Sequence, residues 1–281
     1  MKICRLELIE KELKNSHVIP KFAFDYLKST GSKYLRSFEN PNKRLQDGIK
    51  EYLLCDDCEQ LFSKRERWFA NTIFFPYLNK NKTEFKYDEN LGYFVISLLW
   101  RVLVNQQNHY SVKDEGRLAF LSEVECEWRQ FLTEFKYPRN FNNFNILLTD
   151  GVQSNNTDLV TPDYFFTRLI DFTIVHNNDF TTVAVYAKFL RFIFWVPVKG
   201  YEYIDGTTNI NLNEGILKTP QNLDDTFIKS FFVSRIRLID NADEPNEEQE
   251  KKIMNEILKD VNGFWASDLG RSILNDSKNS I

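Results

Sequence analysis

The chain of 281 residues contains no apolar run that could cross a membrane. Its longest apolar runs, Phe94–Trp100 and Phe192–Val198, fall far short of the roughly 20 apolar residues that a membrane-spanning helix requires. Met1 and Lys2 lead into a mixed polar segment instead of the apolar stretch that defines a secretory signal. We therefore expect a cytoplasmic protein that makes no membrane contact.

Cysteine is also scarce, with four residues, of which three lie within the first 58 positions. Four cysteines do not make the disulfide framework of a small secreted domain, and without a secretory signal they indicate a reducing compartment and metal ligation. The phosphate-binding loop, the dinucleotide-binding glycine pattern and the G-x-S-x-G nucleophile elbow are missing as well. The sequence therefore gives no reason to expect an enzyme of the classes that those motifs define.

The composition is that of an ordinary globular chain, with 42% hydrophobic and 27% charged residues. The charge is unevenly distributed, because residues 1–80 carry 15 Lys and Arg against 11 Asp and Glu, whereas the remainder carries 21 against 29. A basic first part would suit contact with nucleic acid, and DNA is the partner that we expect. Ordinary solvated lysines would give the same surplus of positive charge.

The sequence predicts an α+β fold with two domains, separated by the polar segment 79–83. Residues 1–80 are expected to form a small zinc-organised domain, in which a knuckle and a hairpin precede a helix over 58–75 that ends at Pro76.

Residues 85–281 are expected to form a larger α+β domain, through which the chain would meet a protein partner. Apolar residues at helical spacing predict helices within 90–135, and the segment 247–261 predicts a C-terminal helix. β-branched and aromatic clusters between turn residues predict strands within 144–240, including one over Phe231–Ile239.

Cys55 and Cys58 form a Cys-x-x-Cys pair at the start of a predicted helix, which is a preferred half-site for zinc. Cys4 offers a third thiolate, and the position three residues after it is Glu7. Three thiolates and one carboxylate would then bind the ion, unless another residue completes the site or the metal has been lost. The alternative is that the three cysteines are ordinary buried thiols.

His17 lies in a short apolar strand before Pro20, and with the cysteines it carries a resemblance to a known family. The segments Cys4, Ser16-His17-Val18-Ile19-Pro20 and Leu54-Cys55-Asp56-Asp57-Cys58-Glu59 together resemble the HNH (ββα-metal, treble-clef) endonucleases. They resemble more closely uncharacterised bacterial proteins with the pattern CxxC…SHIIP…LLCxxCE. The resemblance covers about the first 75 residues.

The resemblance implies a nuclease site around His17. His17 would take a proton from the water that attacks a phosphodiester, and a divalent ion such as Mg²⁺ or Mn²⁺ would stabilise the developing charge. Glu59 stands where the family places a metal-binding histidine, and Glu66, seven residues further on, would be a second ligand or an outer partner. The alternative for both, and the preferred one for Glu66, is a solvated glutamate of an amphipathic helix. Structural zinc would be held by Cys4, Glu7, Cys55 and Cys58.

The chain departs from the family pattern at several positions. Ser16 replaces an acid before the histidine, Glu59 replaces the helix histidine, and Glu7 replaces a cysteine. The middle polar residue of the pattern has two candidates, Asn42 and Gln46. The first hypothesis is therefore a metal-dependent nuclease that hydrolyses DNA, with an antiphage or toxin-like effector as the analogy. The alternative is a catalytically inactive, zinc-organised module for nucleic-acid or protein binding, and the third is a structural protein without metal.

Overall fold

A four-stranded antiparallel sheet lies at the centre of this computed structural model, which describes residues 2–37, 40–80, 82–108, 115–150, 159–203 and 207–279. The strand order is β6-β9-β8-β7. Its strands are β6 (Asn145–Leu148), β7 (Ile170–His176), β8 (Val183–Phe189) and β9 (Phe192–Lys199). The last three follow one another through short turns, so each pairs with its neighbour in the sequence. The prediction of an α+β fold is confirmed.

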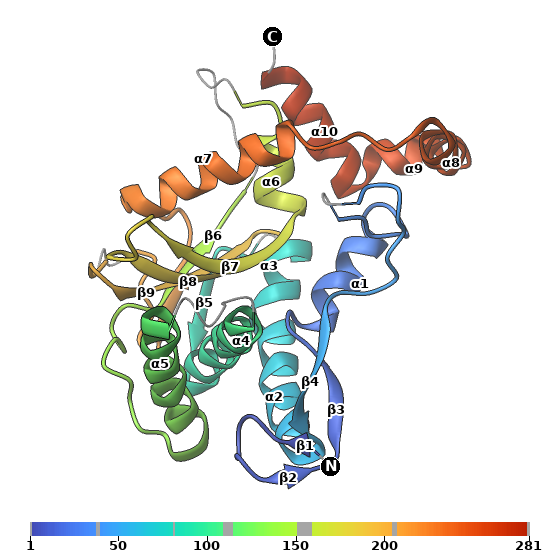
Figure 1. Cartoon of the computed structure of the whole chain (residues 1–281). Coiled ribbons are helices and arrows are strands. Elements are labelled where there is room, and N and C mark those ends of the chain that lie inside the picture. The colour runs from blue at the N-terminus through green and yellow to red at the C-terminus, as the bar shows by residue number, and fades with distance from the viewer. Residues whose placement is uncertain are drawn as a thin grey trace.

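Helices cover both faces of this sheet (Figure 1). One face carries α4 (Glu89–Gln107), which in turn packs against α2 (Asp56–Phe69) and α5 (Glu115–Glu134). Because α4 has neighbours on all sides, every residue from Leu91 to Asn105 is buried. An amphipathic helix could not fill that place, which accounts for the largely apolar character of this segment.

The other face carries α6 (Pro162–Arg168) and α7 (Thr226–Asp240). The segment Phe231–Ile239, which the sequence predicts as a strand, lies within α7, and that prediction is wrong. The buried residues Ile228, Phe232 and Ile236 recur every four positions, and the Asp225 side chain caps the helix by accepting a hydrogen bond from the Ile228 amide at 3.0 Å. The aromatic and β-branched content of Phe231–Ile239 suggests a strand, but the Asp225 cap and the four-residue spacing of the buried side chains favour a helix.

The N-terminal part consists of two strand pairs and two helices. Strand β1 (Lys2–Ile3) pairs with β2 (Glu10–Lys11), and β3 (Leu13–His17) pairs with β4 (Lys50–Cys55), both antiparallel. Helix α1 (Lys21–Ser29) lies between β3 and β4 in the sequence, and α2 follows β4 directly. The first residues thus form a short hairpin, and β3 pairs with β4 across the inserted helix α1.

Helix α2 continues into a π-helical turn, η1 (Ala70–Phe74), and then into α3 (Phe75–Lys80). The helix was expected to end at Pro76, and it does not. Pro76 lies in the first turn of α3, where the π-turn has already interrupted the α-helical hydrogen bonds, so its missing N–H costs little.

The hydrophobic core is continuous across the segment 79–83, where the sequence predicts a domain boundary. One cluster of buried side chains extends from Cys4 to Leu217. Phe69 of α2 stacks on Phe94 of α4 with ring centroids 4.1 Å apart, and it also contacts aromatic rings of the sheet. Beyond the segment, β5 (Glu84–Tyr87) pairs with β10 (Gly215–Lys218).

Three helices end the chain: α8 (Glu247–Leu258), α9 (Val261–Ala266) and α10 (Asp268–Asn279). α8 confirms the predicted C-terminal helix. Residues 275–279 belong to α10, which packs against α6. Among the described residues, no helix is both long and apolar enough to span a bilayer.

Candidate metal centre

The Sγ atoms of Cys4, Cys55 and Cys58 and a carboxylate oxygen of Glu7 all lie within 4.8 Å of one another. The three cysteines are buried and unbridged, and the side chain of Glu7 is 33% exposed. Within the ranges that the structure describes, this is the one group of three or more such side chains close enough to hold a metal ion. The four ligands that the sequence predicts are therefore brought together and could bind a metal.

The turn between β1 and β2 presents Cys4 and Glu7 on the same side. The Cys4 amide donates to the Ile9 carbonyl at 2.8 Å, and the Leu8 amide donates to the Cys4 carbonyl at 2.8 Å. Leu8 takes φ = 59°, a left-handed conformation that closes the turn in place of the more usual glycine. The Arg5 amide bonds to the Leu53 carbonyl at 2.9 Å, which fixes this turn against β4.

Cys55 and Cys58 are positioned by the start of α2, where Cys55 is the N-cap residue. The Cys55 amide donates to the Cys4 sulfur at 3.5 Å, and the sulfurs of Cys4 and Cys58 lie 3.8 Å apart. Cys55 Sγ lies 3.3 Å from Glu7 Oε2. Acidic residues occupy the first turn of α2, where the positive end of the helix dipole favours negative charge.

The three thiols have different proton affinities without a metal. Burial raises the pKa of Cys4, but amide hydrogens, led by that of Glu7, point at its sulfur and lower the pKa below its usual value. Burial raises the pKa of Cys58 far above its usual range, with the sulfurs of Cys55 and Cys4 adding to the effect. A bound cation would favour thiolates at all three positions.

Glu7 is held in its charged form by Lys11. Lys11 Nζ lies 3.0 Å from Glu7 Oε2 and 3.0 Å from Asp57 Oδ2. The hydrogen bond from Lys11, followed by that from Cys55, lowers the pKa of Glu7. The carboxylate is therefore a ready ligand at neutral pH.

His17, at the end of β3, contacts Asp47. His17 Nε2 lies 2.9 Å from Asp47 Oδ1, and the two side chains are 15% and 27% exposed. Burial alone would raise the pKa of Asp47, but hydrogen bonds from Lys50, His17 and the Gly48 amide lower it well below its usual range. A charged carboxylate thus orients the imidazole.

Glu59, on α2, contacts Ser16. Ser16 is buried, and its hydroxyl donates to Glu59 Oε2 at 2.6 Å. Successive residues of a strand point to opposite faces, so His17 turns toward Asp47 while its neighbour Ser16 faces α2. Glu59 does not belong to the cysteine cluster.

Glu66 is paired with Arg101 of α4. Arg101 Nη2 lies 2.7 Å from a carboxylate oxygen of Glu66, and Arg101 Nη1 donates to the His17 carbonyl at 3.0 Å. Glu66 is likewise outside the cysteine cluster. Glu66 thus positions Arg101, which in turn binds the His17 carbonyl. The assignment of Glu66 as a metal ligand stays a prediction.

The sequence interpretation missed two residues at this site, Asp47 and Arg101, and it offered Asn42 and Gln46 as the middle polar residue of the family pattern. Asp47 lies one position beyond Gln46, and an acid directly before Gly48 and the start of β4 was the available signal. Arg101 is the second missed residue. It is a single charged residue in an otherwise apolar helix, and a buried charge requires a partner.

Comparisons with known proteins found no family model, no curated protein and no solved structure that matches the chain.

Proposed function

We propose that the chain is an HNH-like, metal-dependent nuclease that acts on DNA, with structural zinc at Cys4, Glu7, Cys55 and Cys58. The observation that carries the proposal is the contact between Ser16 and Glu59 at 2.6 Å. In the resembled family these positions hold an acid and a metal-binding histidine. They lie far apart in this sequence, but the fold brings them into contact, and Ser16 directly precedes the histidine that would act as base.

Zinc fits the cysteine cluster by distance and by chemistry. In a tetrahedral site with Zn–S bonds of about 2.3 Å, two sulfur ligands lie about 3.8 Å apart. The sulfurs of Cys4 and Cys58 are separated by 3.8 Å. Thiolates with one carboxylate form a donor set that zinc accepts, and such a site would fix the first turn of α2 to the β1–β2 turn.

The His17–Asp47 pair supports the role of a general base. A base must have one ring nitrogen free to take a proton and the other held in place, and Asp47 holds Nε2 at 2.9 Å. With a side chain that is 15% exposed, His17 keeps contact with solvent. Nδ1 would then accept the proton of the attacking water.

Glu59 supplies a hard oxygen ligand on the side of β3 that faces α2, in contact with the residue that precedes this base. A divalent ion such as Mg²⁺ or Mn²⁺, when bound there, would stabilise charge on the phosphate and the leaving oxygen. Ser16 contributes a neutral hydroxyl where the family has an acid, so the site offers less negative charge to the ion. We therefore expect weak affinity for the catalytic metal and slow hydrolysis.

One observation favours the alternative, a binding module without hydrolysis. Lysines near His17 are paired with acids: Lys21 with Asp25 at 2.5 Å, and Lys50 with Asp47 at 2.6 Å. Paired lysines attract the nucleic-acid backbone less strongly than free ones. A zinc-organised surface that binds a protein partner is therefore the second candidate.

Nicking of supercoiled plasmid in Mg²⁺ or Mn²⁺ tests the proposal. We expect nicking by the wild-type protein and its loss in His17→Ala, whereas His176→Ala, an exposed histidine at the end of β7, serves as the matched control and retains activity. Equal inactivity of the wild type and His17→Ala with every metal tried would reject hydrolysis. The binding module would then remain.

A further inference from the structure

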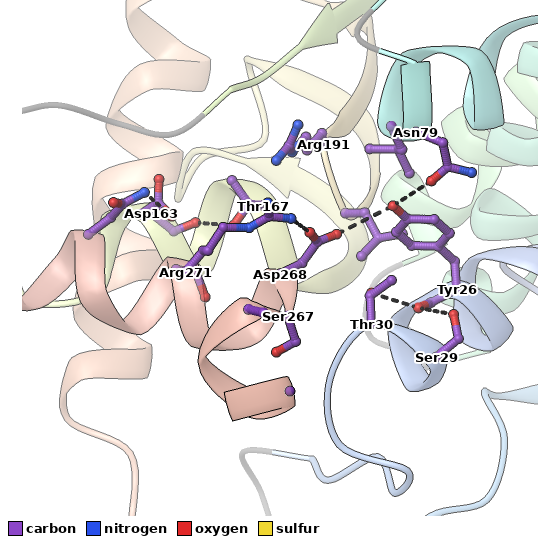
Figure 2. A pocket seen from close by; sticks show the side chains of 16 residues that line it. Tyr26, Ser29, Thr30, Asn79, Asp163, Thr167, Arg191, Ser267, Asp268 and Arg271 are labelled. Atoms are coloured by element: carbon purple, nitrogen blue, oxygen red, sulfur yellow. Dashed lines mark hydrogen bonds and ion pairs between the residues drawn. The ribbon is translucent and has the colours of Figure 1, made fainter. Parts of the chain in front are cut away.

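A polar cleft of 710 Å³ lies between α1, α6 and the C-terminal helices. The end of α1 contributes Tyr26, Ser29 and Thr30, and the start of α10 contributes Asp268 and Arg271, as Figure 2 shows. The cleft is lined by residues other than His17, Glu59 and the cysteine cluster. It is therefore separate from the proposed nuclease site.

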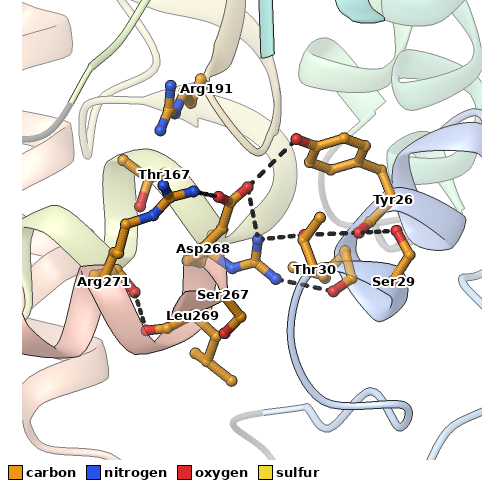
Figure 3. Close-up of polar contacts among 12 residues, drawn as sticks. Tyr26, Ser29, Thr30, Thr167, Arg191, Ser267, Asp268, Leu269 and Arg271 are labelled. Carbon is orange, nitrogen blue, oxygen red and sulfur yellow. Dashed lines mark hydrogen bonds and ion pairs between the residues drawn. The ribbon is translucent and has the colours of Figure 1, made fainter. Parts of the chain in front are cut away.

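Arginines are the most distinctive groups around this cleft. Arg191, which lies in the turn between β8 and β9, is 24% exposed, and it lies 3.5 Å from Asp150, whose own side chain is 71% exposed. Arg271 is 62% exposed and bonds to Asp268 (Figure 3). A guanidinium only donates hydrogen bonds, and pairs of them are well matched to the oxygens of a phosphate.

A third arginine, Arg168, lies behind the wall of the cleft. It is buried and bonds to Thr30 Oγ1 at 2.8 Å and to the Leu27 carbonyl at 2.8 Å, while its Nη1 lies 3.8 Å from Asp268 Oδ2. Asp268 is thus flanked by two arginines, so it does not by itself make the cleft repel anions.

The remaining lining groups suit hydroxyl-bearing molecules. The Tyr26 hydroxyl lies 3.0 Å from Asn79 Oδ1 and 3.4 Å from Asp268 Oδ2, and burial followed by the charge of Asp268 raises its pKa to about 12, so it is a donor at neutral pH. Asp163 and Asp268 are acceptors. Hydroxyl and amide side chains make up much of the rest: Ser29, Thr167, Ser272 and Asn275.

We infer that the cleft binds a sugar phosphate, with Arg191 and Arg271 on the phosphate and the carboxylate, hydroxyl and amide groups on the sugar hydroxyls. A purely anionic ligand would satisfy the arginines and meet Asp163 and Asp268 unfavourably. A neutral sugar would leave Arg191 without an anionic partner inside the cleft. The same chemistry could come from a free sugar phosphate or from the 5′-phosphorylated end of a nucleic acid.

Calorimetric titration with ribose 5-phosphate tests the inference on the full chain. We expect saturable binding, with ribose and inorganic phosphate each binding more weakly. Because a charged hydrogen-bonding pair is lost, Arg191→Gln should weaken binding by at least about tenfold. Arg139→Gln, an exposed arginine on the α5–β6 connection, is the matched control and should bind as the wild type does.

A second variant guards against a folding defect. Ala266 is an exposed residue at the end of α9 that lines the cleft, so Ala266→Trp should block binding sterically while leaving the thermal unfolding midpoint unchanged. Absence of ribose 5-phosphate binding to the wild type, or undiminished binding to both Arg191→Gln and Ala266→Trp, would overturn the inference.

Single-stranded oligonucleotides with a 5′-phosphate or a 5′-hydroxyl separate the two sources. Tighter binding of the phosphorylated oligonucleotide than of ribose 5-phosphate supports a nucleic-acid end as the ligand. Binding of ribose 5-phosphate without binding of the oligonucleotide supports a free metabolite. Equal binding of phosphorylated and hydroxyl oligonucleotides, competing with ribose 5-phosphate, would contradict the role of the phosphate.

Discussion

Replacing Arg101 by methionine should destabilise the protein more than any surface substitution, because this arginine holds the His17 strand to the central helix. Its side chain is 2% exposed, bonds to the His17 carbonyl at 3.0 Å and pairs with Glu66 at 2.7 Å. The methionine would keep much of the packing volume and lose the charge and the donors. Glu66 would then be a carboxylate without its partner in a place that is 19% exposed.

The expected loss follows from these contacts. Breaking a buried ion pair by removing one partner costs about 3–5 kcal/mol. Glu66 is partly exposed and water will screen it to some extent, so the lower end, about 3 kcal/mol, is expected. Part of that loss arises because the Glu66 carboxylate is left without its partner. The double variant Arg101→Met/Glu66→Leu should therefore regain much of the lost free energy of unfolding.

Urea unfolding of the wild type, both single variants and the double variant measures this coupling. Glu66→Leu alone leaves the buried arginine unpaired and should also destabilise the fold. The control is Arg139→Met, an exposed arginine whose loss should change the free energy of unfolding by less than about 0.5 kcal/mol. If Arg101→Met costs no more than the control, or if the effects of the two single variants simply add, the role assigned to the pair is wrong.

Three further predictions concern the candidate site, the core and the C-terminal helix. Ser16→Asp places a second carboxylate beside Glu59, so its melting temperature should be below that of the wild type without metal and should rise more with Mn²⁺; Ser63→Asp, exposed on α2, should show neither change. Phe69→Ala should remove about 3–5 kcal/mol of stability in a single unfolding transition, since the ring is fully buried; two separate transitions would show two independent cores. Asp276 has a pKa raised to about 6, first by burial and then by Asp163 and Asp240, so its contribution to stability should fall as the pH rises from about 4 to 6 and stay constant above. Asp276→Asn should remove that part of the pH profile, and superimposable profiles would contradict the assignment.

The sequence predicted local features of the N-terminal part well because they depend on neighbouring residues. Cys-x-x-Cys before a helix, and a strand ending before Pro20, are short-range patterns, and the cluster of Cys4, Glu7, Cys55 and Cys58 is present as expected. The structural identity as an HNH-like domain stays a prediction.

Contacts between residues that are far apart in the chain could not be predicted from the sequence. Asp47 reaches His17 only because α1 and its following loop return the chain to the end of β3, and Arg101 reaches the His17 carbonyl from another helix. The helix over Phe231–Ile239 was missed because aromatic and β-branched residues favour strands locally. In the fold this segment packs on the sheet through buried side chains at every fourth position, which is the spacing of a helix. The proposed domain boundary was drawn from polar composition, which does not reveal that Phe69 and Phe94 stack across it.

The metal content of the purified protein tests the central claim most directly. We predict one zinc ion per chain, with X-ray absorption fitting three sulfur ligands and one oxygen, and loss of the ion in Cys58→Ser but not in Cys126→Ser, whose cysteine lies on α5 outside the cluster. Protein that folds without bound metal, or a Cys58→Ser variant that keeps the same zinc stoichiometry and the same absorption spectrum, would contradict the account.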